Sequence, residues 1–250
     1  MKKKLWKATQ KNNQAAPAKS FSSRRRPGDS SGMRILDESA SPKNVHFVKV
    51  NLKGAYFHKA DLQNKDFTNA KLQNAFLNEA NLKNAILAKT KLDGASLVYT
   101  DLSGANLSRA SLRGAHLLNA NFDRAQLAKA NLKNSQLINA DFSQADLENA
   151  NLSECNLTGA NFERAFLEKT DLRKANLTNA NMEGANLSCA NLKEADLTNV
   201  NFREAYLSQT KNLTVEELKR VSTLFGAEME EGLKREIYEK FPHLFEEPSW

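Results

Sequence analysis

Few side chains in this 250-residue chain belong to the types that carry out chemistry, and their spacing argues against an active site. The two cysteines, Cys155 and Cys189, lie 34 residues apart, and the four histidines are scattered. Neither set has the spacing of a disulfide scaffold, a zinc module or a His-rich metal site. No glycine-rich phosphate loop, HExxH helix or nucleophile elbow occurs. We therefore expect no catalytic residues, no cofactor and no metal.

The elements that position these residues follow a five-residue period. Every fifth residue from Phe47 to Leu207 is bulky and apolar, which gives 25 Leu, 7 Phe and one Met at 33 positions. The residue two before each of them is small except at Val45, Val50, Lys65 and Val200, and it is Ala in 24 of the 33 cases. A period of five fits neither an amphipathic helix nor an ordinary strand. It predicts a solenoid in which each repeat buries its apolar face against its neighbours.

The phenylalanine spacing predicts how many repeats make one coil. Phe122, Phe142, Phe162, Met182 and Phe202 are separated by 20 residues. Side chains of one bulky type stack best on their own kind, so a spacing of 20 implies four repeats per coil and a square cross-section. A parallel-strand spacing of about 4.8 Å then predicts about eight coils and a rod roughly 40 Å long.

The repeats, such as AlaAsnLeuSerArg at 105–109, resemble those of the pentapeptide-repeat family, with its pattern Ala-(Asp/Asn)-Leu-x-x. The resemblance covers residues 45–210 and implies an all-β solenoid, a right-handed quadrilateral β-helix in which the bulky and small residues point inward. We expect the Asn and Asp residues to form the tight corners. The predicted core includes the following inward residues: Leu112, Leu132, Leu152, Leu172, Phe122, Phe142, Phe162, Met182 and Phe202.

Lys65 occupies an inward position near the start of the repeats. A buried ammonium group is costly, so we expect either a local bulge or a first coil that is open to water.

The period ends after Leu207, and helical signals follow in 211–250. Thr214 and Glu217 form a capping box, and Leu218 begins an apolar face that continues to Phe225, with Gly226 as the stop. A second helix is predicted over the apolar positions 229, 233, 237 and 241, before Pro242. The segment resembles the C-terminal helices of many bacterial members of the family. We expect it to cap the exposed solenoid end, with homodimerisation through these helices as an alternative.

Charge is distributed unevenly along the chain. The overall net charge is +7, but residues 1–46 carry +8, 47–133 carry +7, 134–210 carry −5 and 211–250 carry −3. Residues 1–44 are predicted to be a disordered basic arm because they have few bulky apolar residues. The chain has no apolar run long enough for a secretory signal or a membrane span, which favours a cytoplasmic location. Organellar targeting or effector export through the arm stays open.

Outward residues that are 20 apart should stack into columns, and two sets of columns are candidates for binding. Basic residues form a predicted ridge along one corner of the rod, where a polyanion could bind. Val98, Leu118 and Ile138 form an apolar column that fits either a protein interface or ordinary strand formers. The basic ridge consists of Lys89, Lys91, Arg109, Arg113, Lys129 and Lys133.

These features favour a non-catalytic scaffold that binds another macromolecule, most simply a protein, through its β-helix surface. One alternative is the binding of nucleic acid or another polyanion by the arm and the ridge. Another comes from the family resemblance, since some members protect DNA gyrase by imitating DNA. The basic first half of this solenoid makes it a poor mimic. A bacterial effector acting in a host cell is a further alternative.

Overall fold

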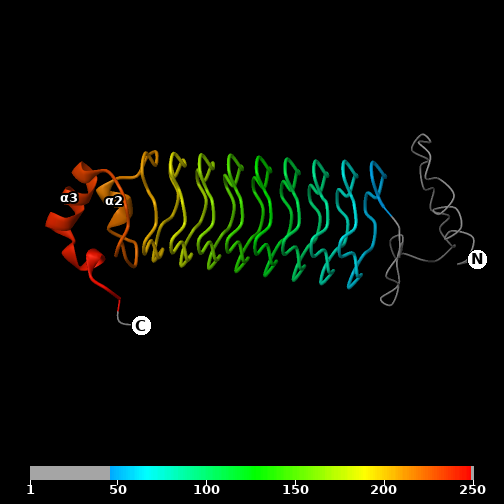
Figure 1. Ribbon diagram of the computed structural model, residues 1–250, viewed down its shortest axis with the longest axis horizontal. Coiled ribbons are helices and arrows are strands. Elements are labelled where there is room, and N and C mark those ends of the chain that lie inside the picture. The colour runs from blue at the N-terminus through cyan, green and yellow to red at the C-terminus, as the bar shows by residue number, and fades with distance from the viewer. Residues whose placement is uncertain (1–45, 249–250) are drawn as a thin grey trace, which may run out of the picture.

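A computed structural model describes residues 46–248, which form a rod of stacked coils closed at one end by a helical segment (Figure 1). The expected arm at 1–44 lies outside the described residues. From residue 51 onward the chain repeats one five-residue conformation, in which a parallel bridge is followed by a turn. The bridges join residues 20 apart, from Asn51↔Lys71 to Asn191↔Lys211. The prediction of four repeats per coil, and hence of a quadrilateral β-helix, is confirmed.

The core is a set of stacked side chains of the same kind. The rings of Phe122 and Phe142 lie 4.7 Å apart and nearly parallel, and those of Phe142 and Phe162 lie 5.0 Å apart. Leu132 and Leu152 have no exposed surface. Each layer therefore packs on an equivalent layer, and the interior is filled by protein side chains. The remaining core residues named above are also buried: Leu112, Leu172, Met182 and Phe202.

Polar side chains at the small inward positions share one hydrogen bond. The Thr90 hydroxyl donates to the carbonyl of Phe67 at 2.8 Å, and the Ser135 hydroxyl donates to that of Leu112 at 2.7 Å. In each case the acceptor lies 23 residues earlier, on the preceding coil. Because a buried hydroxyl without a partner is costly, this regular bond explains how polar groups replace alanine in the core.

The corners are turns with one left-handed residue each. In a typical corner the Ala95 N–H donates to the Leu92 carbonyl at 2.9 Å, and the intervening Gly94 has a φ of 66°. Asparagine occupies many of these left-handed corners, as at Asn74 with a φ of 56°, and Asn or Asp also fills most of the bridge positions just before the bulky residues. There they accept from the N–H two residues on, as Asp101 does from Ser103 at 2.9 Å. The expected role of Asn in the tight corners is therefore confirmed, whereas the Asp residues bond the backbone from the bridge positions.

Lys65 produces no bulge, and of the two alternatives the structure agrees with a first coil that is open to water. The Lys65 N–H makes the ordinary corner bond to Leu62 at 3.2 Å, and its carbonyl accepts from Ile86 at 2.9 Å. The side chain is half-buried in the first described coil, as is Val50. The alkyl stem of a lysine can line an apolar surface while its ammonium reaches water, which removes the need for a bulge.

The C-terminal segment differs from the expected pair of helices. The helix α2 spans only Val215–Leu218, and the Thr214 N–H donates to the Glu217 carboxylate at 3.1 Å. Thr223 then bridges Asn201, and Glu228 bridges Tyr206. Residues 222–229 therefore form part of one further coil, with Gly226 as its left-handed corner at φ 69°. The predicted helical face from Leu218 to Phe225 was wrong because its second half belongs to the β-helix.

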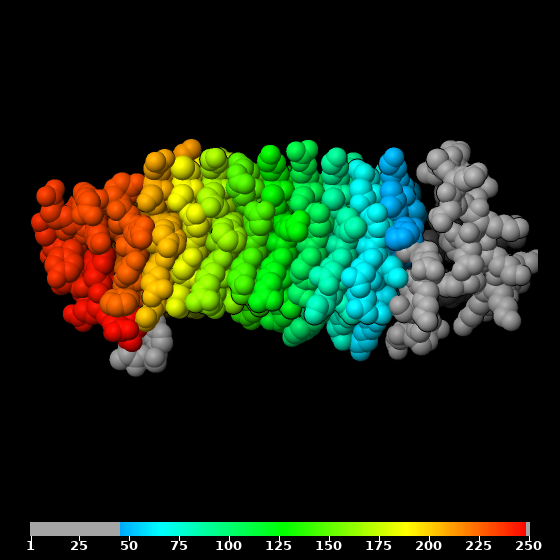
Figure 2. Space-filling view, in the orientation of Figure 1, coloured from blue at the N-terminus to red at the C-terminus, as the bar shows by residue number. Residues whose placement is uncertain are grey.

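The second predicted helix is present and seals the end of the rod. The helix α3 spans Glu231–Lys240, with Ile237 fully buried, and the short 3-10 helix η1 spans Pro242–Phe245. The Leu244 carbonyl accepts the edge N–H of Leu224 at 2.6 Å. In Figure 2 this segment covers the end of the coil stack. Covering an edge in this way prevents pairing with another chain.

Candidate functional site

The rod presents its outward side chains as a lattice with fixed spacing. Each repeat points two residues inward, while the bridge residue and the two turn residues face outward. Equivalent positions on successive coils are joined by backbone hydrogen bonds in both directions, as in Lys91 N–H to Ala70 and Leu72 N–H to Lys91. Backbone ladders of this kind hold successive coils, and hence successive members of one column, about 4.8 Å apart along the rod. Surface charges are therefore arranged by sequence position alone.

The six predicted ridge residues frame a face and do not follow one corner. Lys91 lies at a bridge position and pairs with Lys71 on the coil before it. Lys89, Arg109 and Lys129 lie at the turn that precedes this face, and Arg113 and Lys133 lie at the turn that follows it. We call this surface the basic face. The ridge is divided between two corners because the bridge segment 90–92 separates positions 89 and 93.

Most of the basic face is not neutralised within residues 46–248. Lys133 pairs with Glu154 at 3.1 Å, whereas no ion pair is formed there by Lys89, Lys91 or Arg109. Asp93 is the single carboxylate among these turns, and it accepts from the Ser111 hydroxyl and from the Arg113 N–H at 3.2 Å. The Asp93 carboxylate thus supports the next coil and leaves the basic side chains free to meet a ligand.

Further along the same face, charges are paired. Arg173 donates two hydrogen bonds to Asp171, at 2.8 and 2.7 Å. These bonds hold the pKa of the Asp171 carboxyl below its usual value. Lys174 pairs with Glu194 at 3.6 Å. The unpaired positive charge of this face is therefore denser in the N-terminal half of the rod, while Lys169 in the second half also forms no ion pair within residues 46–248.

The apolar column predicted from the sequence is only partly accessible. Val98, Leu118 and Ile138 are all half-buried at turn positions. The Val98 N–H is bound by the Asn78 side chain at 3.0 Å, which holds this turn against its neighbour. The structure brings the three residues into one column, but their exposed area is smaller than that of other apolar side chains.

A more exposed apolar surface lies on another face, and sequence reasoning missed it. Ile86, Phe166 and Tyr206 all lie in the column that begins at Asp66, and 42%, 52% and 45% of their surface is exposed. We call this surface the aromatic face. Its members are not on successive coils, so they do not stand out in the sequence as a stacked apolar column. Sorting every position by its place in the 20-residue coil would have found them.

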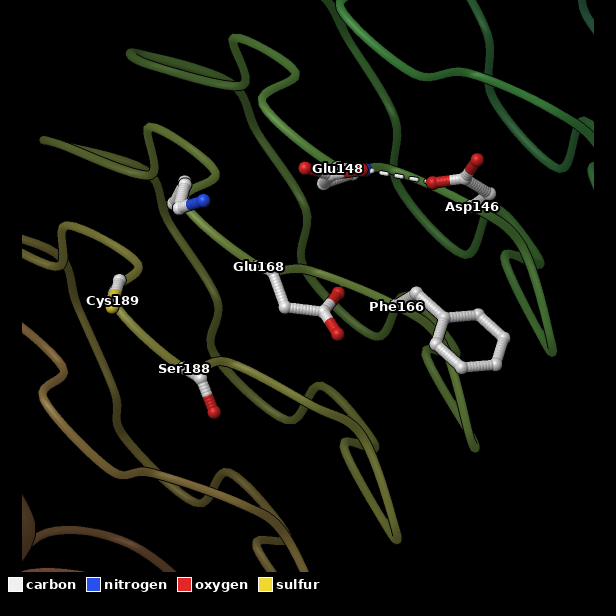
Figure 3. Close-up of a pocket in the computed structure, with 7 residues that line it drawn as sticks. Asp146, Glu148, Phe166, Glu168, Ser188 and Cys189 are labelled. Atoms are coloured by element: carbon white, nitrogen blue, oxygen red, sulfur yellow. Dashed lines mark hydrogen bonds between the residues drawn. The ribbon is translucent and has the colours of Figure 1, made fainter.

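The aromatic face includes an open surface recess of about 540 Å³ (Figure 3). Its lining combines the exposed Phe166 ring with the carboxylates of Glu148 and Glu168 and the side chain of Lys169. Glu168 accepts from the Asn186 amide at 2.5 Å, and the Glu148 N–H donates to Asp146 at 3.0 Å. The recess therefore carries both acidic groups and a basic one beside an exposed aromatic ring.

The face that lies half a coil away from the basic face, ten residues along the chain, is lined by Asn and Asp side chains. The Asn161 amide donates to Asp141 at 3.0 Å, Asn181 to Asn161 at 3.1 Å, and Asn201 to Asn181 at 2.8 Å. Such a ladder satisfies its own polar groups. This column therefore serves the stability of the rod, and it offers fewer free groups to a partner.

The two cysteines have separate environments. Cys155 is buried at a small inward position, and its thiol donates to the Leu132 carbonyl at 2.9 Å. Burial raises the pKa of this thiol to about 12, which keeps it protonated and unreactive. Cys189 is partly exposed and lies 3.4 Å from Gln209 Oε1. Cys155 is therefore a packing residue of the core.

Residues 46–248 contain neither a metal site nor a membrane-spanning helix. Among residues 46–248, no group of three or more His, Cys, Asp or Glu side chains is arranged to hold a metal ion. Neither α2 nor α3 has the length and apolar character to cross a bilayer, and this applies to every described helix.

Comparisons with known proteins agree with the repeat pattern. A family model described as pentapeptide repeats matches residues 43–74, 66–97, 100–137, 135–173 and 175–211, with 8 copies. The fold of this family is the right-handed quadrilateral β-helix. No curated protein matches the chain.

Among solved structures, the chain is similar to HetL, a protein involved in heterocyst differentiation regulation in the cyanobacterium Nostoc. The two are 35% identical over 62% of this chain and 78% of that one, with a TM-score of 0.33. It is also similar to the Arabidopsis thaliana thylakoid-lumen protein AT2G44920, at 36% identity over 41% and 64% of the chains and a TM-score of 0.29. QnrB1, a plasmid-mediated fluoroquinolone resistance protein, is 21% identical over 73% and 92%, with a TM-score of 0.43.

Proposed function

This chain belongs to the pentapeptide-repeat family, and we propose that it is a non-catalytic scaffold that binds another macromolecule through its β-helix surface. The observation that carries the proposal is the lattice of outward side chains. Backbone ladders fix these side chains on both sides of every coil, so a partner meets a surface that is already ordered. Preorganisation of this kind lowers the entropic cost of binding.

The basic face is the surface that best fits a partner, and a polyanion is the partner chemistry that it favours. Lys71 and Lys91 stack directly on each other, and the turns beside them add Lys89, Arg109 and Arg113. Stacked like charges repel, and this cost is relieved when a polyanion displaces the counterions. Regular axial spacing allows several contacts to one extended anionic chain.

The experiment is heparin and nucleic-acid binding by the full chain and by a variant with Lys89→Glu, Lys91→Glu and Arg109→Glu. We expect salt-sensitive retention of the native protein, and loss of at least about tenfold in affinity in the variant. A matched control reverses three basic side chains of the second half, Lys169, Lys174 and Lys193. Equal loss in both variants, or no retention of the native protein, would contradict polyanion binding on this face.

A protein partner at the aromatic face is the second candidate, and its support is the exposed Phe166 and Tyr206 side chains. Aromatic residues are enriched where protein interfaces bury surface. Affinity capture with the native chain and with Phe166→Ser/Tyr206→Ser tests it. A partner that is captured equally by both proteins does not use this face.

A further inference from the structure

Next to the basic face lies a further surface that carries aromatic side chains in the first half of the rod. Its bridge positions on four successive coils are Tyr56, Phe76, Ser96 and His116. The Phe76 side chain is 44% exposed, and its ring centroid lies 5.8 Å from that of Tyr56. The turn after Ser96 adds Tyr99, which is 61% exposed. We call these five residues the stacking face.

The stacking face leaves a gap between two of its rings. Ser96, the smallest of its members, separates Phe76 from His116. These two residues are two coils apart, which corresponds to about 9.6 Å at the parallel-strand spacing of about 4.8 Å. The Ser96 hydroxyl donates to Asn78 Oδ1 at 2.7 Å, so its own polar group is satisfied. Because nucleobases stack at about 3.4 Å, one base fits above Ser96 and against the Phe76 ring.

Tyr99 occupies an unusual backbone position for an aromatic residue. Its φ is 56°, and it is the only aromatic side chain among the left-handed residues of 46–248. The neighbouring coils have Glu79 and Asn119 at the same corner. A bulky side chain in the left-handed region costs free energy. A largely exposed ring at such a position therefore points to contact with a ligand.

The corner between the stacking face and the basic face carries few side chains. Its left-handed position on the first four coils is Gly54, Gly94 and Gly114, with Asn74 on the remaining coil. A Cβ added at Gly54 or Gly114 would meet nothing within 4 Å. Further along the rod, Glu154 adopts the same angle with φ 61°, so the backbone does not require glycine here. The low corner allows one ligand to contact both faces.

The charges on both sides of the stacking face leave it net positive. At the low corner, Lys53 and Arg113 form no ion pair within residues 46–248. Asp93 lies between them and accepts from the Arg113 N–H at 3.2 Å. At the opposite corner, the Glu79 carboxylate is paired with Lys59 at 3.4 Å. The exposed rings therefore adjoin a surface that attracts anions.

We propose that the polyanion bound by this rod is a single-stranded nucleic acid, with a base stacked on Phe76 and its backbone on Lys71 and Lys91 of the basic face. This inference rests on the proposed polyanion binding and adds the rings to it. Unpaired bases stack on aromatic side chains while their phosphates follow a positively charged surface. A sulfated polysaccharide has no base to stack, and a duplex keeps its bases paired. Only a single strand uses both faces.

Two double variants separate the contribution of the rings from that of the charges. The test variant is Phe76→Ser/Tyr99→Asn, and both new residue types already occur at the equivalent positions of neighbouring coils. The control variant is Phe166→Ser/Tyr206→Ser, which removes two exposed rings from the aromatic face. Both variants keep every basic residue of the chain. Both should also keep the native circular dichroism spectrum.

Fluorescence anisotropy with labelled oligo(dT) and oligo(U) of about 20 nucleotides, and with a duplex of equal length, measures the affinities. The native chain should bind both single strands at least about tenfold more tightly than the duplex, although the duplex has the higher charge density. The test variant should lose at least about tenfold in affinity for the single strands. Its heparin retention and the salt dependence of its binding should stay unchanged, since no phosphate contact is removed. The control variant should bind like the native chain.

The outcomes distinguish this inference from the proposed function. Heparin retention together with equal or tighter binding of the duplex would leave polyanion binding in place and overturn the single-strand assignment. Equal single-strand affinity in the native chain and the test variant, or an equal loss in the control variant, would overturn the role of the stacking face. Absence of both heparin and nucleic-acid binding would overturn polyanion binding and this inference together.

Discussion

The two halves of the rod have the same interior and opposite exteriors. In both halves, Leu and Phe stack on equivalent residues 20 positions away, and every corner has the same left-handed turn. Outside, residues 47–133 carry +7 and residues 134–210 carry −5. The fold therefore depends on the two inward positions of each repeat. The charge at the three outward positions can vary without changing the fold.

The halves also differ in how their charges are used. Cations of the first half are largely unpaired in the described residues, whereas the second half contains the Asp171–Arg173 pair and the contacts of Arg203 with Glu183 and Glu204. Exposed pairs of this kind contribute little to stability. The two halves therefore differ in the ligands that each can bind. A substitution in the shared interior should lower the stability by a similar amount in either half.

The largest effect is expected from deletion of the C-terminal segment, which covers the exposed end of the second half of the rod. Deletion of 213–250 removes the partial coil with Leu224 and the helix α3 with Ile237. The exposed apolar layer and open strand edges should then drive polymerisation or insolubility. Light scattering after size-exclusion chromatography measures this. A folded monomer of the truncated chain would show that the second half needs no cover.

The next largest effect is a cavity in the shared core. Leu132→Ala in the first half and Leu152→Ala in the second should each lower the free energy of unfolding by roughly 2–5 kcal/mol, because both side chains are fully buried. Chemical denaturation measures the change. Lys133→Ala, one position along and only half-buried, is the control and should cost little. A large difference between the two Leu variants would contradict the equivalence of the halves.

A smaller effect is expected at the corners. Tyr99 occupies a left-handed corner with φ 56°, where glycine is found in other coils, such as Gly104. Tyr99→Gly should raise the free energy of unfolding by about 0.5–1 kcal/mol, since the strained backbone is relieved at an exposed site. Thermal melting measures it. A destabilised variant would mean that the tyrosine side chain contributes more than its backbone costs.

The smallest effect concerns acid stability in the second half. The pKa values of Asp171 and Asp196 are lowered, by the side-chain hydrogen bonds from Arg173 and Thr198 respectively. A carboxyl with a lowered folded pKa stabilises the protein above its unfolded pKa, and this is lost as the pH falls. Asp171→Asn should therefore reduce the loss of stability below about pH 4. An unchanged pH profile in denaturation would exclude a role for this pair.

Much of the fold is predictable because the repeat leaves few alternatives. The Phe122, Phe142 and Phe162 spacing gives the coil directly, since identical rings stack at that interval. The additional coil at 222–229 was missed because two extra residues shift the repeat. Ala227 and Met229 retain the small-to-bulky spacing, but the apolar positions before them also fit a helix. Where two periods compete over so few residues, tertiary contacts decide.

The candidate surfaces were less predictable than the core. Lys91 and Arg113 could be placed near each other from the coil length, but the strand between them determines that they frame a face. Phe166 is 52% exposed and lines the recess together with Glu148 and Glu168, which its position in the repeat alone does not predict. Periodicity gives the direction of a side chain, while accessibility depends on the neighbouring side chains.

The 20-residue coil also sets the distance between surface features along the rod in fixed steps. Because each coil is bonded only to the one before and the one after it, a whole coil could be duplicated or removed without changing any corner or layer. Each duplication would move the positive and negative halves apart by about 4.8 Å. The distance between two binding surfaces can thus change in equal steps during evolution, with the chemistry of each surface left intact.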